Sequence, residues 1–315
     1  MKKQTLSVVI SAYNEQEKIE ACLTSVHTLA DEIIFVDNTS TDKTIYIAKK
    51  YTTKIFARQN NPMLNVNKNF GFSKATGDWI LSLDADERVT PELREEIISV
   101  IGNWKLEIGN SRVCGFWIPR KNIIFGKWIQ SNMWWPDYQL RLFKKDKGRF
   151  PEQHVHEYVK VDGETAKLKA PLFHENYSSI SQFLYKMDKI YTENEADTIL
   201  KSGRRLGYID ALRFPVDDFL KTFFLQKGYK DGLHGLVLSM FQAFYAEVVF
   251  AKVWEKQGFQ EENSQHFLED LHREFKKIKS ELQYWYLTSV ISDTKNSAKK
   301  IFYRILRKSL KKKTS

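Results

Sequence analysis

The first hundred residues alternate between short β-rich runs and helical patterns, and this alternation limits the fold more than any other feature of the chain. The apolar, β-rich runs are residues 6–11, 32–37, 54–57 and 79–83. Apolar spacing, capping residues and Pro91 predict helices at residues 15–29, 41–51, 67–76 (closed by Gly77) and from residue 90 onward. This alternation predicts an α/β fold with a mostly parallel sheet and right-handed crossovers. Ligands of such sheets bind beyond the carboxyl ends of the strands.

The rest of the chain has a different pattern. Short β-like runs occur at residues 114–118, 140–143 and 155–161, with aromatic and polar residues between them. From Ser178 onward the pattern is helical, with a break expected at Phe214-Pro215 and a loop near Gly258. We therefore predict a sheet domain of residues 1–177, a helical appendage of residues 178–294 and a basic tail of residues 295–315.

The formal net charge of +10 belongs almost entirely to the end of the chain. Residues 295–315 contain nine basic and no acidic residues, which leaves 40 basic and 39 acidic residues before them. A nucleic-acid-binding protein would carry basic residues across a folded face, so no nucleic acid is expected as a partner. The two cysteines, Cys22 and Cys114, are too few for a disulfide framework and predict a reducing compartment.

Three segments bear on membrane association. On a helical wheel of residues 297–311, apolar and basic side chains fall on opposite sides, which is typical of a helix lying in an anionic membrane surface; a solvated lysine-rich end is the alternative. Residues 232–251 carry His234 and Glu247, so we interpret them as a buried or interfacial helix and not as a spanning one. The apolar run near the N-terminus ends at Asn14, too early for a signal peptide.

Asp84-Ala-Asp86 follows directly after the strand at residues 79–83. Side chains two residues apart on an extended segment point to the same side, so both carboxylates can face one cavity. Two such oxygen donors suit Mg²⁺ or Mn²⁺, with a diphosphate supplying further oxygens. A solvated turn is the alternative. Asp37 also ends a predicted strand, where it could accept a hydrogen bond from a nucleoside or simply form a turn.

Motifs in a fixed order carry a family resemblance. They are Ser11-Ala-Tyr-Asn-Glu15, Val36-Asp37-Asn-Thr-Ser-Thr-Asp-Lys-Thr44, Lys68-Asn69-Phe-Gly71 and Gly77-Asp-Trp-Ile-Leu-Ser-Leu-Asp84-Ala-Asp86-Glu87. Together they resemble glycosyltransferase family 2, whose members are inverting enzymes with a GT-A fold, over roughly residues 5–175. Later segments are similar to the lipopolysaccharide-core β-glucosyltransferase branch: Pro136-Asp-Tyr-Gln-Leu-Arg-Leu-Phe143, Val155-His-Glu157, Phe173-His-Glu-Asn-Tyr177 and Lys230-Asp-Gly-Leu-His-Gly235.

The resemblance implies a role for each donor-binding residue. Tyr13, Glu15 and Asp37 would line the nucleotide pocket, with Asp37 near the uracil. Lys68 stands where the family usually has Arg, and it would meet the pyrophosphate as a point charge without the bidentate fork of Arg. Asp84 would contact the ribose or the metal, and Asp86 would be the main metal ligand.

Asp137 is the expected general base, because it resembles the acidic residue of the family's Glu-Asp motif, although Pro136 replaces the Glu. The alternative is that Asp137 pairs with Arg141 or caps a turn. His156 is the preferred further metal ligand and His174 the second choice, although a histidine in a β-rich stretch is more often structural.

Trp128, Trp134 and Trp135 precede this aspartate in the sequence. They could form a sugar-stacking platform or simply pack in the core.

The resemblance thus implies metal-assisted transfer of a hexose, glucose as the first choice, from a UDP-sugar to a lipid-linked or cell-envelope glycan. We expect this hexosyltransferase to act peripherally on the cytoplasmic face of the membrane. Two alternatives stay open. One is a non-catalytic membrane- or nucleic-acid-binding protein on a transferase-like fold. The other is a sugar nucleotidyltransferase, which would normally show a glycine-rich phosphate loop that residues 6–15 lack.

Overall fold

The computed structural model describes residues 3–61, 63–102, 107–108, 111–152, 157–260 and 265–311. The chain divides into two compact units. Unit 1 comprises residues 1–128 and 135–176, and unit 2 comprises residues 129–134 and 177–315.

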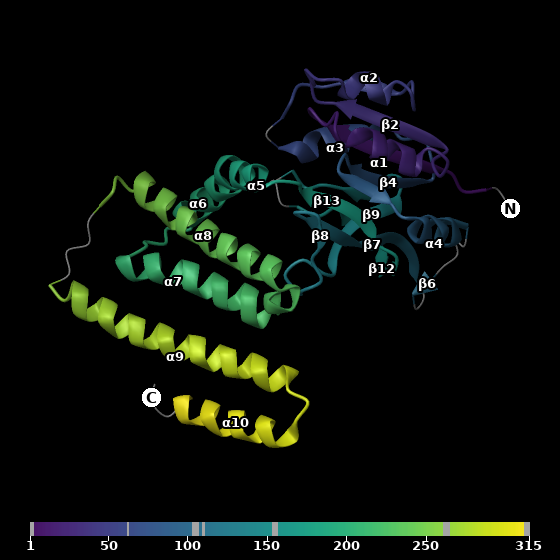
Figure 1. Ribbon diagram of the computed structural model, residues 1–315. Coiled ribbons are helices and arrows are strands. Elements are labelled where there is room, and N and C mark those ends of the chain that lie inside the picture. The colour runs from purple at the N-terminus through teal and green to yellow at the C-terminus, as the bar shows by residue number, and fades with distance from the viewer. Residues whose placement is uncertain are drawn as a thin grey trace. The chain divides into compact units, whose positions relative to one another are not determined.

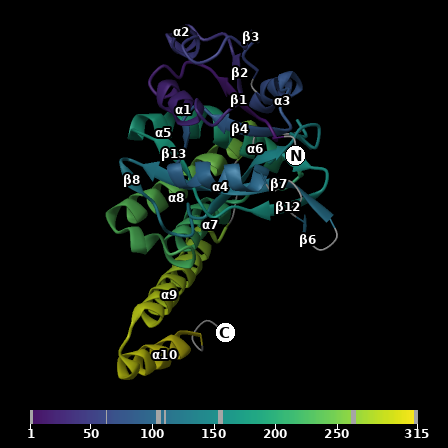
Figure 2. The same ribbon diagram turned by 90° about the vertical axis from the view of Figure 1, so that its right-hand side faces the viewer.

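The parallel half of the sheet in unit 1 is built from the first four strands, β1 (Leu6–Ala12), β2 (Glu32–Asp37), β3 (Ile55–Ala57) and β4 (Trp79–Asp84). Their order in space is β3-β2-β1-β4; β2 and β4 are labelled in Figure 1 and all four strands in Figure 2. The chain therefore runs outward from β1 to β3 and then returns to the other side of β1. Such a reversal creates a crevice at the carboxyl ends of the strands, which is where open α/β sheets bind ligands.

The rest of the sheet in unit 1 is mixed. β9 (Asp137–Lys144) pairs antiparallel with β4, β7 (Ser111–Ile124) pairs with β9, and β13 (Leu172–Tyr177) pairs antiparallel with β5 (Glu87–Val89). The shorter strands are β6 (Glu107–Ile108), β8 (Lys127–Trp128), β10 (Gly148–Arg149), β11 (Lys160–Val161) and β12 (Glu164–Lys167). β7 continues well past the predicted end at residue 118. In the predicted run 155–161, residues 155 and 156 lie outside the described residues.

Helices cover both faces of the parallel strands, as Figure 2 shows for α1 (Ile19–Val26) and α3 (Leu64–Lys74). Val8 and Ile10 of β1 pack in the core with α1 and α4 (Pro91–Gly102), whereas Val9 between them packs with Phe72 of α3. Side chains of a strand alternate between its two faces, which explains this division. The remaining helix, α2 (Thr44–Ala48), follows β2.

Helix α3 differs from its predicted bounds. It begins three residues before the predicted start and ends at Lys74, because Ala75 has an extended backbone with ψ 137°. The predicted closure by Gly77 is therefore wrong. Gly77 is needed for a different reason: a Cβ there would lie 2.7 Å from Ser7 Oγ, at the start of β1.

Unit 2 is helical. Its elements are α5 (Ile180–Lys186), η1 (Met187–Tyr191), α6 (Thr192–Lys201), α7 (Tyr208–Phe219), η2 (Leu220–Leu225), η3 (Gly228–Asp231), α8 (Leu233–Lys256), α9 (Phe267–Asp293) and α10 (Ser297–Lys311). The predicted break at Phe214-Pro215 is wrong, because Pro215 lies inside α7. Proline has a helical φ, and although its ring lacks an N–H donor and crowds the carbonyl of the preceding turn, α7 continues past it to Phe219 and is followed by the π-helical η2. The predicted loop at Gly258 is confirmed, since its φ of 76° follows the end of α8.

Helix α8 contains most of the weakly charged stretch at residues 232–251. Among the described residues it is the one helix whose length and composition would allow it to cross a membrane, with a mean hydropathy of 1.5. Core helices of soluble proteins pass the same test, but only 28% of this stretch is buried, and Leu233, Met240 and Phe244 are exposed. Most of this stretch therefore does not pack in a core, and its position at a membrane interface stays a prediction.

The predicted fold class, an α/β protein with a largely parallel sheet and helices at its C-terminal end, is confirmed. The predicted domain limits at residues 177 and 294 stay a prediction.

Candidate functional site

The loop after β1 is fastened to the loop after β2. Asn14 adopts a left-handed φ of 54°, its backbone N–H donates to Ser40 Oγ at 3.0 Å, and its Oδ1 accepts from the Thr41 N–H at 2.8 Å. The backbone N–H of Glu15 donates to Thr44 Oγ1 at 2.8 Å. These contacts bring the predicted residues Tyr13 and Glu15 to the same strand ends as Asp37.

The contacts of Asp37 are compatible with both roles considered from the sequence, turn formation and a hydrogen bond to a nucleoside. Its carboxylate is 1% exposed, and Oδ2 accepts from the backbone N–H of Ser40 at 3.0 Å, which forms the turn. Its Oδ1 is buried and has no hydrogen-bond partner in the described part of the chain. A buried acceptor without a donor costs about 1–3 kcal/mol, so this oxygen is suited to a ligand N–H or O–H group.

Asp84, the last residue of β4, lies opposite Ser11 of β1 in the strand register. Its Oδ1 is 2.5 Å from Lys68 Nζ on α3, and its Oδ2 accepts from Arg141. Burial raises the pKa of this carboxyl, but the charges of Arg141 and Lys68 outweigh burial and hold the pKa well below its usual range. Asp84 is therefore ionised and is paired with the ammonium group of Lys68.

Glu87 is the fully buried centre of an ion-pair network. Its Oε1 is 2.6 Å from Arg141 and 3.5 Å from Arg120, and its Oε2 accepts from the backbone N–H of Asp84 at 3.0 Å. Burial lowers the pKa of Arg141, but the charges of Asp84 and Glu87 raise it above its usual value, so the guanidinium stays charged. Buried charges persist when they are paired in this way.

Asp86 faces His174. The pairing of β5 with β13 sets His174 opposite Glu87, and the backbone N–H of Glu175 donates to the Asp86 carbonyl at 3.0 Å. In this geometry His174 Nε2 is 3.6 Å from Asp86 Oδ1, and Lys18 Nζ is 4.0 Å from Oδ2. Burial raises the pKa of Asp86, but the hydrogen bond and charge from His174 bring it below its usual value.

Asp137 begins β9 and pairs with Arg120, not with Arg141, so the alternative pairing considered from the sequence is wrong. Its Oδ2 accepts from Arg120 Nε at 2.8 Å and from Asn122 Nδ2 at 3.3 Å, and its Oδ1 accepts from Gln139 at 2.8 Å. Burial raises the pKa of Asp137, and Arg120 with the two amides lowers it to below the usual value. The carboxylate is thus the dominant form at neutral pH.

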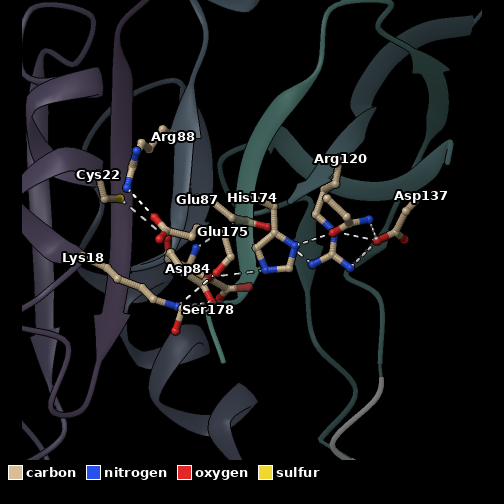
Figure 3. Close-up of polar contacts among 12 residues, drawn as sticks. Lys18, Cys22, Asp84, Glu87, Arg88, Arg120, Asp137, His174, Glu175 and Ser178 are labelled. Carbon is tan, nitrogen blue, oxygen red and sulfur yellow. Dashed lines mark hydrogen bonds and ion pairs between the residues drawn. The ribbon is translucent and has the colours of Figure 1, made fainter. Parts of the chain in front are cut away.

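The two ends of the site are connected through His174 (Figure 3). Its Nδ1 lies 2.6 Å from Oδ1 of Asn122, and Nδ2 of Asn122 donates to Oδ2 of Asp137. A continuous series of polar contacts therefore runs from Asp86 through His174 and Asn122 to Asp137. The described residues contain no group of three or more His, Cys, Asp or Glu side chains placed to hold a metal ion, and within this part of the chain Asp86 and His174 are a facing pair of possible ligands.

Several sequence candidates lie elsewhere. His154 and His156 lie outside the described residues, so the choice of His156 as a metal ligand stays a prediction. Trp128 and Trp135 pack edge to face at 5.3 Å in unit 1, whereas Trp134 packs against Tyr177 in unit 2. A cavity of about 760 Å³ beside α3 is lined mainly by the β10–β11 region and contains none of the predicted site residues.

Glu87, Arg120 and Asn122 were missed by the sequence reasoning. Glu87 directly follows the Asp-x-Asp motif, and no local pattern distinguishes it from a solvated turn residue. Arg120 and Asn122 are two residues apart and share one face of β7, a signal that was hidden because the strand was predicted to end at residue 118.

Known proteins resemble this chain along most of its length. The family model described as glycosyl transferase family 2 matches residues 7–159. An uncharacterized glycosyltransferase of Rickettsia typhi is 30% identical over 267 residues, covering 81% of this chain and 88% of that protein. The lipopolysaccharide core biosynthesis glycosyltransferase LpsC of Rhizobium meliloti is 26% identical over 260 residues, covering 81% of this chain and 93% of LpsC.

Among solved structures, S. aureus TarS 1-349 in complex with UDP-GlcNAc is 16% identical and covers 81% of this chain and 92% of that one. Its TM-score of 0.43 is too low to support an inference about this chain.

Proposed function

The chain belongs to glycosyltransferase family 2, and from this premise we propose that it transfers a hexose, glucose as the first candidate, from a UDP-sugar to a cell-envelope glycan with inversion at the anomeric carbon. One arrangement carries the proposal. Asp86 and His174 face each other with their ligand atoms 3.6 Å apart, and polar contacts lead from them to the ionised Asp137.

The donor is proposed to bind at the carboxyl ends of β1, β2 and β4. The unpartnered Oδ1 of Asp37 supports a contact with a uracil or ribose donor group. Lys68 neutralises Asp84 at 2.5 Å and is the cation that a pyrophosphate would recruit. Tyr13, 43% exposed, and Glu15 would form the wall of the same pocket.

The residues present fit a divalent cation. A carboxylate oxygen and an imidazole nitrogen that face each other suit Mn²⁺, and Mg²⁺ is also often held by one or two protein ligands together with substrate phosphates. In this assignment Asp86 and His174 are the protein ligands, and Asp84 either assists them or contacts the ribose. A metal bound there would supply positive charge that offsets the charge developing on the departing diphosphate.

Asp137 is proposed as the general base. Its carboxylate takes the proton of an acceptor hydroxyl, whose oxygen forms a bond to the anomeric carbon while the bond from that carbon to UDP breaks on the opposite side. Arg120 and Asn122 hold Oδ2, and Oδ1 accepts from Gln139. Arg120 also favours the ionised form, so the base is ready at neutral pH although it is weaker than a free carboxylate.

The acceptor is proposed to be a lipid-linked or envelope glycan, and the similarity to LpsC supports this class. Helix α10 supports a location on the cytoplasmic membrane face. Its Arg307 donates to Thr288 of α9 at 3.1 Å, so that side of α10 lies against α9 (Figure 1). Its apolar side chains Ile301, Phe302 and Ile305 are exposed, as expected for a helix that inserts one face into a bilayer surface.

Thermal-shift titration with UDP-hexoses, with and without Mn²⁺, tests the donor and the metal together. Wild type should be stabilised by UDP-sugar with Mn²⁺, and Asp86→Ala should lose the metal-dependent part of the shift. The exposed Asp162, which pairs only with Lys147 in the described part of the chain, provides the matched control Asp162→Ala. Absence of a shift with every UDP-hexose would contradict the proposed donor class.

Asp137→Asn tests the base separately. It should keep the donor-induced shift and lower transfer by about 10²–10⁴-fold, the usual contribution of a general base. Transfer at close to the wild-type rate would remove Asp137 from this role.

A further inference from the structure

Asn122 occupies the centre of the site, although no sequence motif marks it. It is fully buried on β7, and the strand order places β7 between β9, which carries Asp137, and β13, which carries His174. Its Nδ2 is 3.3 Å from Asp137 Oδ2, and its Oδ1 is 2.6 Å from His174 Nδ1. A buried amide in such a position must turn its NH₂ group toward an acceptor and its carbonyl oxygen toward a donor.

The direction of each hydrogen bond follows from the ion pair at one end. Asp137 is an ionised carboxylate paired with Arg120, so its Oδ2 only accepts. Asn122 must therefore turn its NH₂ group toward Asp137 and its carbonyl oxygen toward His174. That oxygen also only accepts, so His174 must carry a proton on Nδ1.

We propose that Asn122 is a positioning residue that holds a proton on Nδ1 of His174 and thereby leaves Nε2, the nitrogen that faces Asp86, as the one that binds a metal. This inference rests on the proposed function, because it gives the metal-ligand role of His174 a physical cause. A neutral imidazole binds a metal through the nitrogen that carries no proton, and the hydrogen bond at the other nitrogen decides which one that is. Without Asn122, Asp86 would be the acceptor that remains, and it would favour the opposite tautomer, with the proton on Nε2.

The same residue links the two halves of the reaction. Asn122 donates to the proposed base and accepts from the proposed metal ligand. A single side chain therefore fixes the positions of both the proposed base and the proposed metal ligand. Loss of Asn122 should disturb Asp137 and His174 together.

Nitrogen NMR of histidine-labelled protein, without metal or donor, reads the tautomer directly. The His174 signal is identified by its absence in His174→Gln. At pH 8 the wild type should show a proton on Nδ1 of His174, and Asn122→Ala should lose that proton and carry one on Nε2 alone. In the presence of UDP, the dissociation constant for Mn²⁺ should rise by about 10–100-fold in Asn122→Ala, the usual effect of losing the partner of a metal-ligating histidine.

Gln139→Ala is the matched control, because it also removes a donor from Asp137 but does not touch His174. It should leave the His174 tautomer and the Mn²⁺ dissociation constant unchanged. If Asn122→Ala does not fold, the isosteric Asn122→Asp keeps an acceptor facing His174 and should keep the proton on Nδ1.

An Nε2–H tautomer in the wild type, an unchanged tautomer in Asn122→Ala, or a proton on Nε2 alone in Asn122→Asp would overturn the inference. Failure of the proposed function looks different. In that case His174→Gln would leave Mn²⁺ binding unchanged while Asn122 still controlled the tautomer.

Discussion

At the scale of single residues, Asp84 and Asp137 differ in which cation keeps them ionised. Asp84 is held by Lys68 and Arg141, and Asp137 by Arg120. The pairing matters for chemistry, because a cation that lowers the pKa of a base also lowers its proton affinity. If Asp137 is the base, as proposed, Arg120 sets the pH range in which it can accept a proton.

Arg120→Gln should move the acid limb of the pH–rate profile to higher pH. In the proposed mechanism, transfer needs the carboxylate form of Asp137, and this form is lost as the pH falls through its pKa. Arg120 holds that pKa below the usual value, so removal of its charge should raise the pKa and move the limb upward by roughly 1 unit or more. Initial rates between pH 4 and 8 measure this shift. The control is Arg149→Gln, at an exposed ion pair with Glu152, which should leave the acid limb of the profile unchanged. If Arg120→Gln also leaves the acid limb unchanged, a group other than Asp137 determines the pH at which the rate falls.

Sequence motifs predicted the site carboxylates but not the partners that control them. Asp37 and Asp84 could be named because each directly follows an apolar run. Arg120 could not, since it is 17 residues from Asp137 in sequence and their pairing depends on the register of β7 against β9. Register depends on the whole sheet, and a short local pattern does not encode it.

At the scale of elements, α3 carries Lys68 to the site, and its closeness to the sheet depends on Gly71. A Cβ at Gly71 would lie 2.5 Å from Val9 Cγ1 and 3.1 Å from Val36 Cγ2. Gly71→Ala should therefore lower the free energy of unfolding by about 1–3 kcal/mol despite the better helix propensity of alanine. It should also weaken UDP binding, because α3 must move away from β1. Gly102→Ala is the control, because nothing lies within 4 Å of its added Cβ, and it should change the free energy of unfolding by no more than about 0.5 kcal/mol. Urea titrations measure both variants. Equal effects of the two substitutions would contradict this account.

Glu32 joins the elements at the other end of the parallel strands. Its carboxylate accepts from Ser7 of β1, from Lys54 before β3 and from the backbone N–H of Thr76 before β4. Burial raises the pKa of Glu32, but these hydrogen bonds lower it from 4.5 to about 2. Because the folded pKa is depressed, the stabilisation is complete above pH 4.5 and is lost as the pH falls toward 2.

Glu32→Gln should thus reduce the free energy of unfolding most at pH 6, by up to about 3 kcal/mol, and the difference from wild type should narrow toward pH 3. Urea titrations at both pH values measure it. Glu20→Gln, at an exposed ion pair with Lys50, should cost less than about 1 kcal/mol. A difference that stays constant with pH would show that Glu32 acts through packing alone.

At the scale of the whole molecule, the net charge of +10 separates into a nearly neutral body and a cationic end. The sequence predicts an apolar and a basic side for residues 297–311. In the structure, Arg307 of the basic side packs against α9, where its guanidinium carbon lies 5.5 Å from the centre of the Tyr284 ring. The apolar side is exposed, and the basic residues Arg304 and Lys308 are exposed as well. Burial of a hydrophobic face and attraction of cations to anionic headgroups would then act together, each basic residue contributing about 1 kcal/mol near such a surface.

Removal of residues 295–315 should release the protein from phosphatidylglycerol-containing vesicles and leave UDP binding unchanged, because the site residues lie in unit 1. Phe302→Asp should weaken sedimentation with these vesicles, since a charge on the apolar side of α10 opposes insertion. Leu268→Asp, on α9 at 77% exposure, is the matched control for the loss of any exposed apolar side chain and should have no effect. Equal binding to neutral phosphatidylcholine vesicles would exclude an electrostatic contribution to membrane binding. Unchanged sedimentation of the truncated protein would show that another surface, such as the exposed side of α8, contacts the membrane.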